Sequence, residues 1–152
     1  MARDTTGQWF GTPMDDDDVD AILESEGYAV LSLARDDDPY SIPVSLGYDG
    51  TDAYFVLLED GPKGEKFDYI EDGGTVRLLV MDVHSRFDWR SVAVTGTARR
   101  VERDTDEWEH LADTMADNAW FTRGFERADS VQDVHGWRVA DAEVRGLRVA
   151  ED

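Results

Sequence analysis

The two lysines of the chain, Lys63 and Lys66, both lie in one glycine-containing stretch that leads into a predicted helix. Free backbone N–H groups, the positive end of a helix dipole and a lysine side chain can together bind a phosphate group. Alternatively, the two lysines pair on the surface with Glu59, Asp60 or Glu65. The stretch is a candidate phosphate site, and its residues alone leave both interpretations open.

A second candidate is the alternating stretch Tyr40–Tyr48, which has the period of a half-buried strand. Because Pro43 has no N–H group, we expect an edge or a bulge here, where backbone groups of Ile42–Ser45 can bind a planar heterocycle. The alternative is an ordinary edge strand that proline protects from further pairing. The polar side of the strand consists of Ser41, Pro43, Ser45 and Gly47, and the apolar side of Ile42, Val44, Leu46 and Tyr48.

Other chemistries find less support in the sequence. There is no cysteine, which excludes disulfides, thiolate nucleophiles and cysteine-ligated metals. The histidines, His84, His110 and His135, do not have the spacing of metal ligands, so we expect no metal site. Carboxylates are so numerous that no pair stands out as an acid and a base.

Acidic residues dominate the composition, with 35 Asp and Glu against 15 Lys and Arg and a net charge of −20. A surface so negative repels nucleic acids and anionic membranes, and its self-repulsion is screened best at high salt. We therefore expect a halophilic, haloarchaeal protein; an acidic interaction face is the alternative. The apolar runs are too short for a membrane span or a signal peptide, which favours a cytoplasmic location.

The elements that must position these residues form a mainly β domain with short helices. With 152 residues we expect one domain over 15–152 and an N-terminal tail over 1–14. Helices are predicted after Asp15–Asp18, from the end of the loop Gly61–Gly64 to about Glu71, and over about Thr105–Asn118. Strands are predicted over Tyr28–Ala34, Tyr40–Tyr48, Ala53–Leu58, Thr75–Val83 and Trp89–Glu102, with a final pair, Val134–Ala140 and Val144–Ala150, joined across Asp141–Ala142. This pattern indicates a six- to seven-stranded antiparallel split β-barrel.

The order of these segments resembles the pyridoxamine 5'-phosphate oxidase-like FMN-binding split-barrel family, especially its small nitroimidazole-resistance-type branch. The likeness covers about Asp15–Ala150. It rests on the order and spacing of several strings together: Gly27–Leu33, Pro39–Ser45 with Tyr48–Gly50, Gly64–Lys66 and Trp89–Gly96.

The resemblance implies a homodimer with FMN in the groove between the protomers. By position, the backbone of Ser41, Ile42, Pro43, Val44 and Ser45 would lie along the flavin ring. Lys66 would meet the phosphate, with Lys63 nearby, although Glu65 replaces the family's usual basic residue. The string of Trp89, Arg90 and Ser91 would lie near the flavin and phosphate, and Trp137 or Arg138 of the partner protomer could cover the ring.

The function implied is that of an FMN-dependent oxidoreductase acting between a small electron donor and a small acceptor. The alternatives are a binding module that holds a flavin, a deazaflavin or haem without turnover, and a scaffold whose groove is vestigial. The aromatic residues Trp120, Phe121 and Phe125 could form a lid over the flavin or pack into the core. The oxidase's own basic substrate motifs are absent, which argues against oxidation of pyridoxamine phosphate itself.

Overall fold

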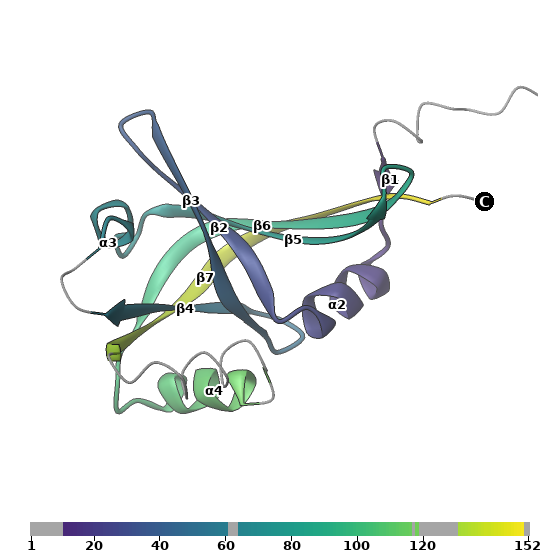
Figure 1. Cartoon of the computed structure of the whole chain (residues 1–152). Coiled ribbons are helices and arrows are strands. Elements are labelled where there is room, and N and C mark those ends of the chain that lie inside the picture. The colour runs from purple at the N-terminus through teal and green to yellow at the C-terminus, as the bar shows by residue number, and fades with distance from the viewer. Residues whose placement is uncertain (1–10, 61–63, 117, 119–130, 151–152) are drawn as a thin grey trace, which may run out of the picture.

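Seven strands form the body of the computed structural model, which describes residues 11–60, 64–116, 118 and 131–150. They form one antiparallel sheet, and the first and last strands of the barrel also pair with each other, so that six strands close into a barrel and the seventh is added outside (Figure 1). The predicted fold class is thus confirmed. The strands are β1 (Thr12–Pro13), β2 (Tyr28–Arg35), β3 (Asp38–Tyr48), β4 (Ala53–Asp60), β5 (Thr75–Ser85), β6 (Asp88–Val101) and β7 (Val131–Val149).

The strand order is β1-β7-β4-β3-β2-β5-β6, and the additional pairing of β6 with β7 closes the barrel. β2 and β3 form a tight hairpin through Asp36 and Asp37, whose φ angles of 47° and 66° match a two-residue turn of the left-handed type. β1 pairs with β7 and lies within the region predicted as a tail. Met14, which follows it, packs into the core.

Within the described ranges, three helices flank the barrel: α2 (Asp16–Ser25), α3 (Lys66–Tyr69) and α4 (Asp106–Met115). As the acidic run predicts, Asp15 caps α2 by accepting the N–H of Asp18 at 2.9 Å. α3 ends at Tyr69, earlier than predicted, because Ile70 is already extended. None of the helices within the described ranges combines the length and apolarity that a membrane span requires.

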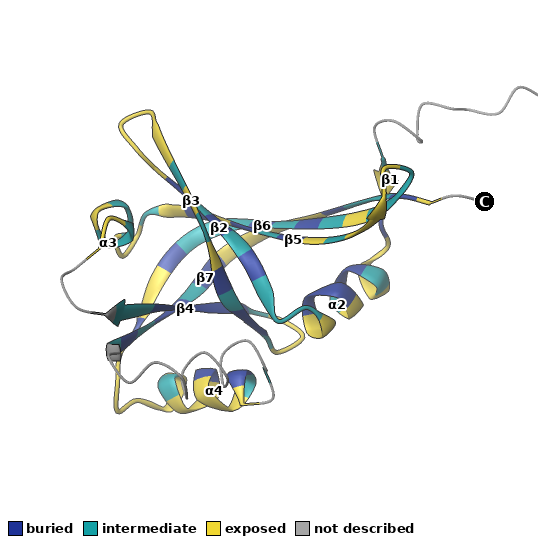
Figure 2. Ribbon diagram, in the orientation of Figure 1, coloured by how far each residue is buried: buried dark blue, intermediate teal, exposed yellow. Residues whose placement is uncertain are grey.

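Apolar side chains fill the inside of the barrel, and a second layer lies outside it under α4. Figure 2 marks the buried positions along the strands and on α2 and α4 in dark blue. The alternation of each strand sends every second residue inward, as Leu31, Phe55 and Leu78 illustrate with no exposed surface. α2 adds its buried face to the same core. The layer under α4 consists of Tyr54, Val56, Val101, Leu111, Met115 and Val134.

The last strand differs from the prediction. Val134–Ala140 and Val144–Ala150 were expected to pair with each other across Asp141–Ala142, and this expectation is wrong. β7 is one continuous strand, and both of its halves pair with β6. The polar break in the sequence therefore marks an irregularity inside a strand and not a hairpin turn.

The physical reason is a bulge opposite Gly96. Asp141 and Ala142 lie opposite this one glycine, and Asp141 has a φ of 52°. A Cβ atom on Gly96 would overlap the carbonyl oxygen of Ala140 and lie 2.9 Å from Cγ1 of Val139. Only glycine lets β7 approach β6 closely enough to accommodate the additional residue.

Candidate functional site

The side chains of β3, β2, β5 and β6 that point away from the core form one outer face of the barrel. A row of polar side chains across all four strands defines it. The Oγ atoms of Ser41 and Ser32 are 3.3 Å apart, Ser32 is registered opposite Arg77, and Arg77 Nε donates to Thr95 Oγ1 at 2.9 Å. Residues two positions away along each strand lie on this same outer face.

The outer face is partly apolar. Val30 and Leu79 are opposite each other on β2 and β5 and remain half-exposed, and Met81 and Val83 are 38% and 64% exposed. None of these four belongs to either hydrophobic cluster of the described residues. The face thus presents apolar surface that the described part of one chain leaves accessible.

Among the residues that the structure describes, no strand pairs with the first half of β3 on the side away from β2, so this half is an open edge. β3 pairs with β2 over Asp38–Ser45, but β4 reaches β3 only from Ser45 to Tyr48. The N–H of Leu46 donates to Gly27 on the β2 side. The hydrogen-bonding direction of the backbone alternates along an antiparallel strand. The N–H and C=O groups of the even-numbered residues of β3 therefore bond to β2, and those of the odd-numbered residues point away from β2.

This alternation identifies which backbone groups in and next to the expected Ile42–Ser45 stretch point toward the open edge and could bind a ligand. Ile42 and Val44 direct their N–H and C=O groups to β2, and Ser45 is registered with Val56 on β4. The groups that face the open edge are the N–H and C=O of Ser41 and the C=O of Pro43. The open edge predicted from Pro43 is present. Within the expected Ile42–Ser45 stretch only Pro43 has a backbone group on this edge, and Ser41, just before the stretch, adds two more.

α3 lies at the end of the barrel where β3 and β4 separate. The ring of Tyr69 stacks on that of Tyr40 with centroids 5.1 Å apart, and the Tyr69 hydroxyl donates to Asp38 at 2.6 Å. This hydrogen bond raises the pKa of Tyr69 to about 12, so the hydroxyl remains a donor at neutral pH. Lys66 begins the helix, with its Nζ atom 5.4 Å from the centroid of the Phe67 ring.

A groove of about 590 Å³ continues the outer face beyond the last β2–β5 pair, where the two strands separate. Ser32, Arg77 and Thr95 of the polar row line one side of it, and Tyr69 and Glu71 line the side toward α3. The groove therefore connects the outer face with the region of α3. It offers one guanidinium group and several hydroxyls to a ligand.

The structure brings some of the predicted site residues together and separates others. The side chains of Ser41, Pro43 and Ser45 lie on the outer face, and on β6 those of Trp89 and Ser91 lie there too, since Ser91 is registered with Met81. Lys66 lies on the neighbouring α3. All of these residues belong to, or adjoin, one side of the barrel.

Four predicted residues lie elsewhere. The side chains of Ile42 and Val44 point toward the core. Arg90 is on the face opposite to Ser91, as strand alternation requires. Trp137 is only 5% exposed and lies inside the barrel, stacked on Phe55 at 6.4 Å, so its ring does not contribute to the outer face of its own chain. Lys63 and the aromatic residues Trp120, Phe121 and Phe125 lie outside the described residues.

Sequence reasoning missed Ser32 and Arg77, which complete the polar row. Ser32 lies inside a strongly apolar run, and its exposed position follows only from the period of two along β2. Arg77 is one of 13 arginines and lies between two apolar residues that face the core. The signal that could have found it is the combination of strand alternation with the register of β5 against β2.

A second group of ionisable residues lies at the β3–β4 turn, where it contacts α2 and α4. Tyr48 donates to Asp20 at 2.6 Å, and burial together with this bond raises its pKa. Asp49 binds the His110 Nε2 at 2.7 Å. Burial raises the pKa of Asp49, but hydrogen bonds from the Asp52 N–H, His110 and the Thr51 N–H outweigh burial and bring the pKa below its ordinary value. These contacts join the β3–β4 turn to α2 and α4, and they stabilise the fold.

Solved structures with the same fold come from several bacteria. A FAD-binding protein from Mesorhizobium loti has a TM-score of 0.70 and 19% identity and covers 92% of this chain and 97% of its own. A FAD- and haem-binding protein from Mycobacterium smegmatis has a TM-score of 0.64 and 16% identity, with 91% and 74% covered. A putative 5-nitroimidazole antibiotic resistance protein from Bacteroides thetaiotaomicron has a TM-score of 0.55 and 19% identity, with 92% and 90% covered.

Comparison of sequences identifies the family. An uncharacterized protein of Rhizobium meliloti (strain 1021) is 28% identical over 87 residues, which are 57% of this chain and 55% of that protein. The chain thus matches about half the length of this curated relative. The family model described as pyridoxamine 5'-phosphate oxidase matches residues 15–148, nearly the whole chain. The chain therefore belongs to the pyridoxamine 5'-phosphate oxidase family, as the order of its strands and turns suggested.

Proposed function

We propose that the chain is a flavin-binding protein that holds FMN against the open edge of β3. The observation that carries this proposal is the set of outward backbone groups there, the N–H and C=O of Ser41 and the C=O of Pro43, beside a partly apolar face. The pyrimidine edge of a flavin carries one N–H donor between two carbonyl acceptors. The open edge thus offers groups complementary to a flavin, and the apolar face offers surface for its ring.

The choice of FMN as the cofactor rests on the charge of Lys66, and the histidines bear on the alternative, haem. Lys66 opens α3 next to the open edge and suits the single phosphate of FMN. Two of the similar structures are described as FAD-binding or as FAD- and haem-binding, which supports a flavin and keeps haem as the alternative. Each histidine of the chain contacts a carboxylate, namely His84 with Asp82, His110 with Asp49 and His135 with Glu59. None of the three histidines lies on β3, whose open edge is the proposed flavin site, so haem has less support there than a flavin.

The apolar outer face supports a homodimer. Met81 and Val83 on β5 leave large exposed apolar area beside Ser91 and Trp89, and a contiguous apolar patch on a small protein is typical of an interface. A second copy of the chain packed on this face would bury these side chains. It would also enclose the open edge of β3 and exclude water from a ring bound there.

We further propose that the holoprotein is a small-molecule oxidoreductase. The bound flavin would supply the electron-transfer chemistry, so the chain needs no nucleophile, in agreement with the absence of cysteine. The residues of the chain bind and orient the cofactor. Ser41 and Pro43 would fix the edge of the ring, Lys66 would hold the phosphate, and the apolar face would limit access of water.

Absorption spectroscopy tests this proposal. Protein purified in molar KCl is expected to be yellow, with a band near ~450 nm that bleaches when NADH or NADPH is added without oxygen. Recovery of the band on addition of an acceptor would support turnover, and a band that resists reduction would support a non-catalytic carrier. Protein that shows no band and does not take up added FMN or FAD would contradict flavin binding.

A further inference from the structure

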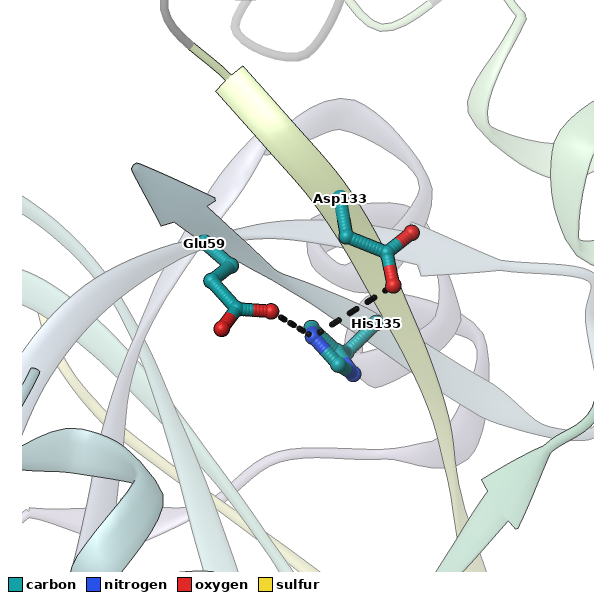
Figure 3. A group of neighbouring side chains, drawn as sticks. All are labelled: Glu59, Asp133 and His135. Carbon is teal, nitrogen blue, oxygen red and sulfur yellow. Dashed lines mark hydrogen bonds and ion pairs between the residues drawn. The ribbon is translucent and has the colours of Figure 1, made fainter. Parts of the chain in front are cut away.

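Three side chains that can bind metal ions meet where β4 ends and β7 begins. Glu59 on β4 is registered directly opposite Asp133 on β7, and His135 lies two residues further along β7. The His135 Nε2 atom is 3.0 Å from Glu59 Oε2 and 3.8 Å from Asp133 Oδ2. One donor atom of each residue lies within 4.8 Å of the other two. Figure 3 shows the three side chains converging.

Two carboxylates that face each other across antiparallel strands repel each other unless a cation lies near them. Arg103 partly offsets this repulsion, since its Nη2 pairs with Asp133 Oδ1, an atom that also accepts the Val134 N–H at 2.8 Å. The second oxygen, Oδ2, is directed toward His135. One oxygen of Glu59 and one of Asp133 therefore flank the imidazole, and a cation between the three donors would offset the remaining repulsion.

The group is partly shielded from water. The side chain of His135 is only 13% exposed and that of Glu59 23%. The ring of Phe67 meets the imidazole edge-on, with centroids 5.0 Å apart. Partial burial strengthens electrostatic attraction to a bound ion, and the packed ring restricts the orientation of the imidazole. The imidazole is therefore held in place before any ion arrives, whereas the side chain of Asp133 is 43% exposed.

The donor set indicates the class of ion. One imidazole nitrogen with two carboxylate oxygens suits a divalent first-row transition metal, whereas Mg²⁺ and Ca²⁺ prefer oxygen ligands alone. With Zn–N and Zn–O bonds of about 2.1 Å, neighbouring ligands of a tetrahedral site are about 3.4 Å apart. The observed separations of 3.0 and 3.8 Å lie on either side of this value. A small adjustment of side chains would bring all three ligands to one ion.

We propose that Glu59, Asp133 and His135 bind a divalent first-row transition-metal ion, with Zn²⁺ the best match. The ion would join the end of β4 to the start of β7, and three protein ligands would leave a fourth position for water or a small ligand. From the sequence we expected no metal site, because the three histidines do not have the spacing of metal ligands. The donors of this site lie on two separate strands, with Glu59 and His135 76 positions apart, so spacing along the chain could not reveal it. The proposal does not depend on flavin binding.

Isothermal titration calorimetry with ZnCl₂ tests the site. The full-length protein is treated with a chelator and returned to molar KCl, which screens the nonspecific attraction of its acidic surface for cations. We expect one Zn²⁺ per chain, and a loss of affinity of at least about tenfold in His135→Gln. Glu59→Gln should show the same direction of change. Circular dichroism establishes that each variant is folded before it is titrated.

His110→Gln is the matched control, because His110 contacts a single carboxylate, Asp49, at 2.7 Å. Its Zn²⁺ affinity should equal that of the wild type, and a large excess of Mg²⁺ should not displace the bound Zn²⁺. The proposal is overturned if the wild-type protein binds no Zn²⁺. It is also overturned if His135→Gln and Glu59→Gln bind as tightly as the wild type, if His110→Gln loses as much affinity as they do, or if Mg²⁺ displaces the ion.

Discussion

Tyr69 stacks on Tyr40 with ring centroids 5.1 Å apart, and this contact holds α3 beside the open half of β3. The helix that carries Lys66 is only Lys66–Tyr69 in length, so its own hydrogen bonds cannot fix its position. The aromatic contact and the hydrogen bond from Tyr69 to Asp38, together with the hydrogen bond from Arg35 Nη1 to the Asp68 carbonyl, therefore set the distance between the proposed phosphate-binding group and the proposed ring-binding edge.

Tyr69→Ala is expected to weaken FMN binding several-fold, because α3 loses its contact with β3 while Lys66 itself remains. Tyr69→Phe is the control, since it keeps the ring and loses only the bond to Asp38. It should retain most of the affinity. Fluorescence titration of FMN in molar KCl measures both variants. Equal affinity in Tyr69→Ala and the wild type would show that the position of α3 does not matter for binding.

Lys66→Ala is expected to weaken FMN binding by about 1.5–3 kcal/mol, the worth of a charge-assisted hydrogen bond to phosphate. Lys66→Arg should keep most of this energy because it keeps the charge. Riboflavin, which has no phosphate, should bind Lys66→Ala and the wild type equally well. If the FMN dissociation constant of Lys66→Ala is unchanged, the phosphate lies elsewhere.

Met81→Asp is expected to dissociate the proposed homodimer, because it puts a charge into the apolar outer face, where Met81 is 38% exposed. Val144→Asp provides the control. Val144 is a comparably exposed apolar residue at 45%, but it is registered with Val94 and so lies on the opposite face of the sheet. Light scattering in molar KCl should give half the wild-type mass for Met81→Asp only. Identical masses for all three proteins would place the interface elsewhere.

Gly96→Ala is expected to destabilise the fold by about 2–4 kcal/mol, because the new Cβ atom would overlap the Ala140 carbonyl at the bulge of β7. Gly64→Ala is a suitable control, since no atom of the described residues beyond its chain neighbours lies within 4 Å of the position of its Cβ. Urea unfolding followed by circular dichroism gives the free energy of unfolding of each. A wild-type value for Gly96→Ala would contradict the close approach of β6 and β7.

Asp49 should stabilise the protein in a pH-dependent manner. Its pKa in the folded state is lowered, so its contribution is complete above the unfolded-state pKa of about 3.9 and is lost as the pH falls through the folded-state pKa. The free energy of unfolding of the wild type should therefore exceed that of Asp49→Asn at pH 6, and the difference should shrink below about pH 3.9. A difference that stays constant over this range would exclude titration of Asp49 as its cause.

The sequence predicted the barrel well because local signals and tertiary structure agree along most strands. The strict alternation of Tyr40–Tyr48 and the Asp49–Gly50 turn fix β3 and its connection to β4 without reference to any distant segment. The continuation of β7 through Asp141–Ala142 could not be predicted in this way. Whether Asp141–Ala142 turns the chain or bulges depends on Gly96, which lies on another strand.

Only part of the candidate site could be predicted, for a similar reason. Pro43 indicates an edge from its own chemistry, but which neighbouring groups face that edge depends on the pairing of Leu46 with Gly27. Trp137 is aromatic and lies in the C-terminal region, yet the register of β7 places it inside the barrel next to Phe55. Residue type indicated the candidates, and strand register decides which of them can meet a ligand.

The central claim is that the open edge of β3 binds the ring of a flavin, and a crystal structure of the protein grown with FMN in molar salt tests it most directly. The claim predicts that the pyrimidine edge of the ring hydrogen-bonds to the backbone of Ser41 and Pro43, with the phosphate near Lys66. A structure in which side chains cover this edge, or in which FMN binds at a different face of the barrel, would contradict it.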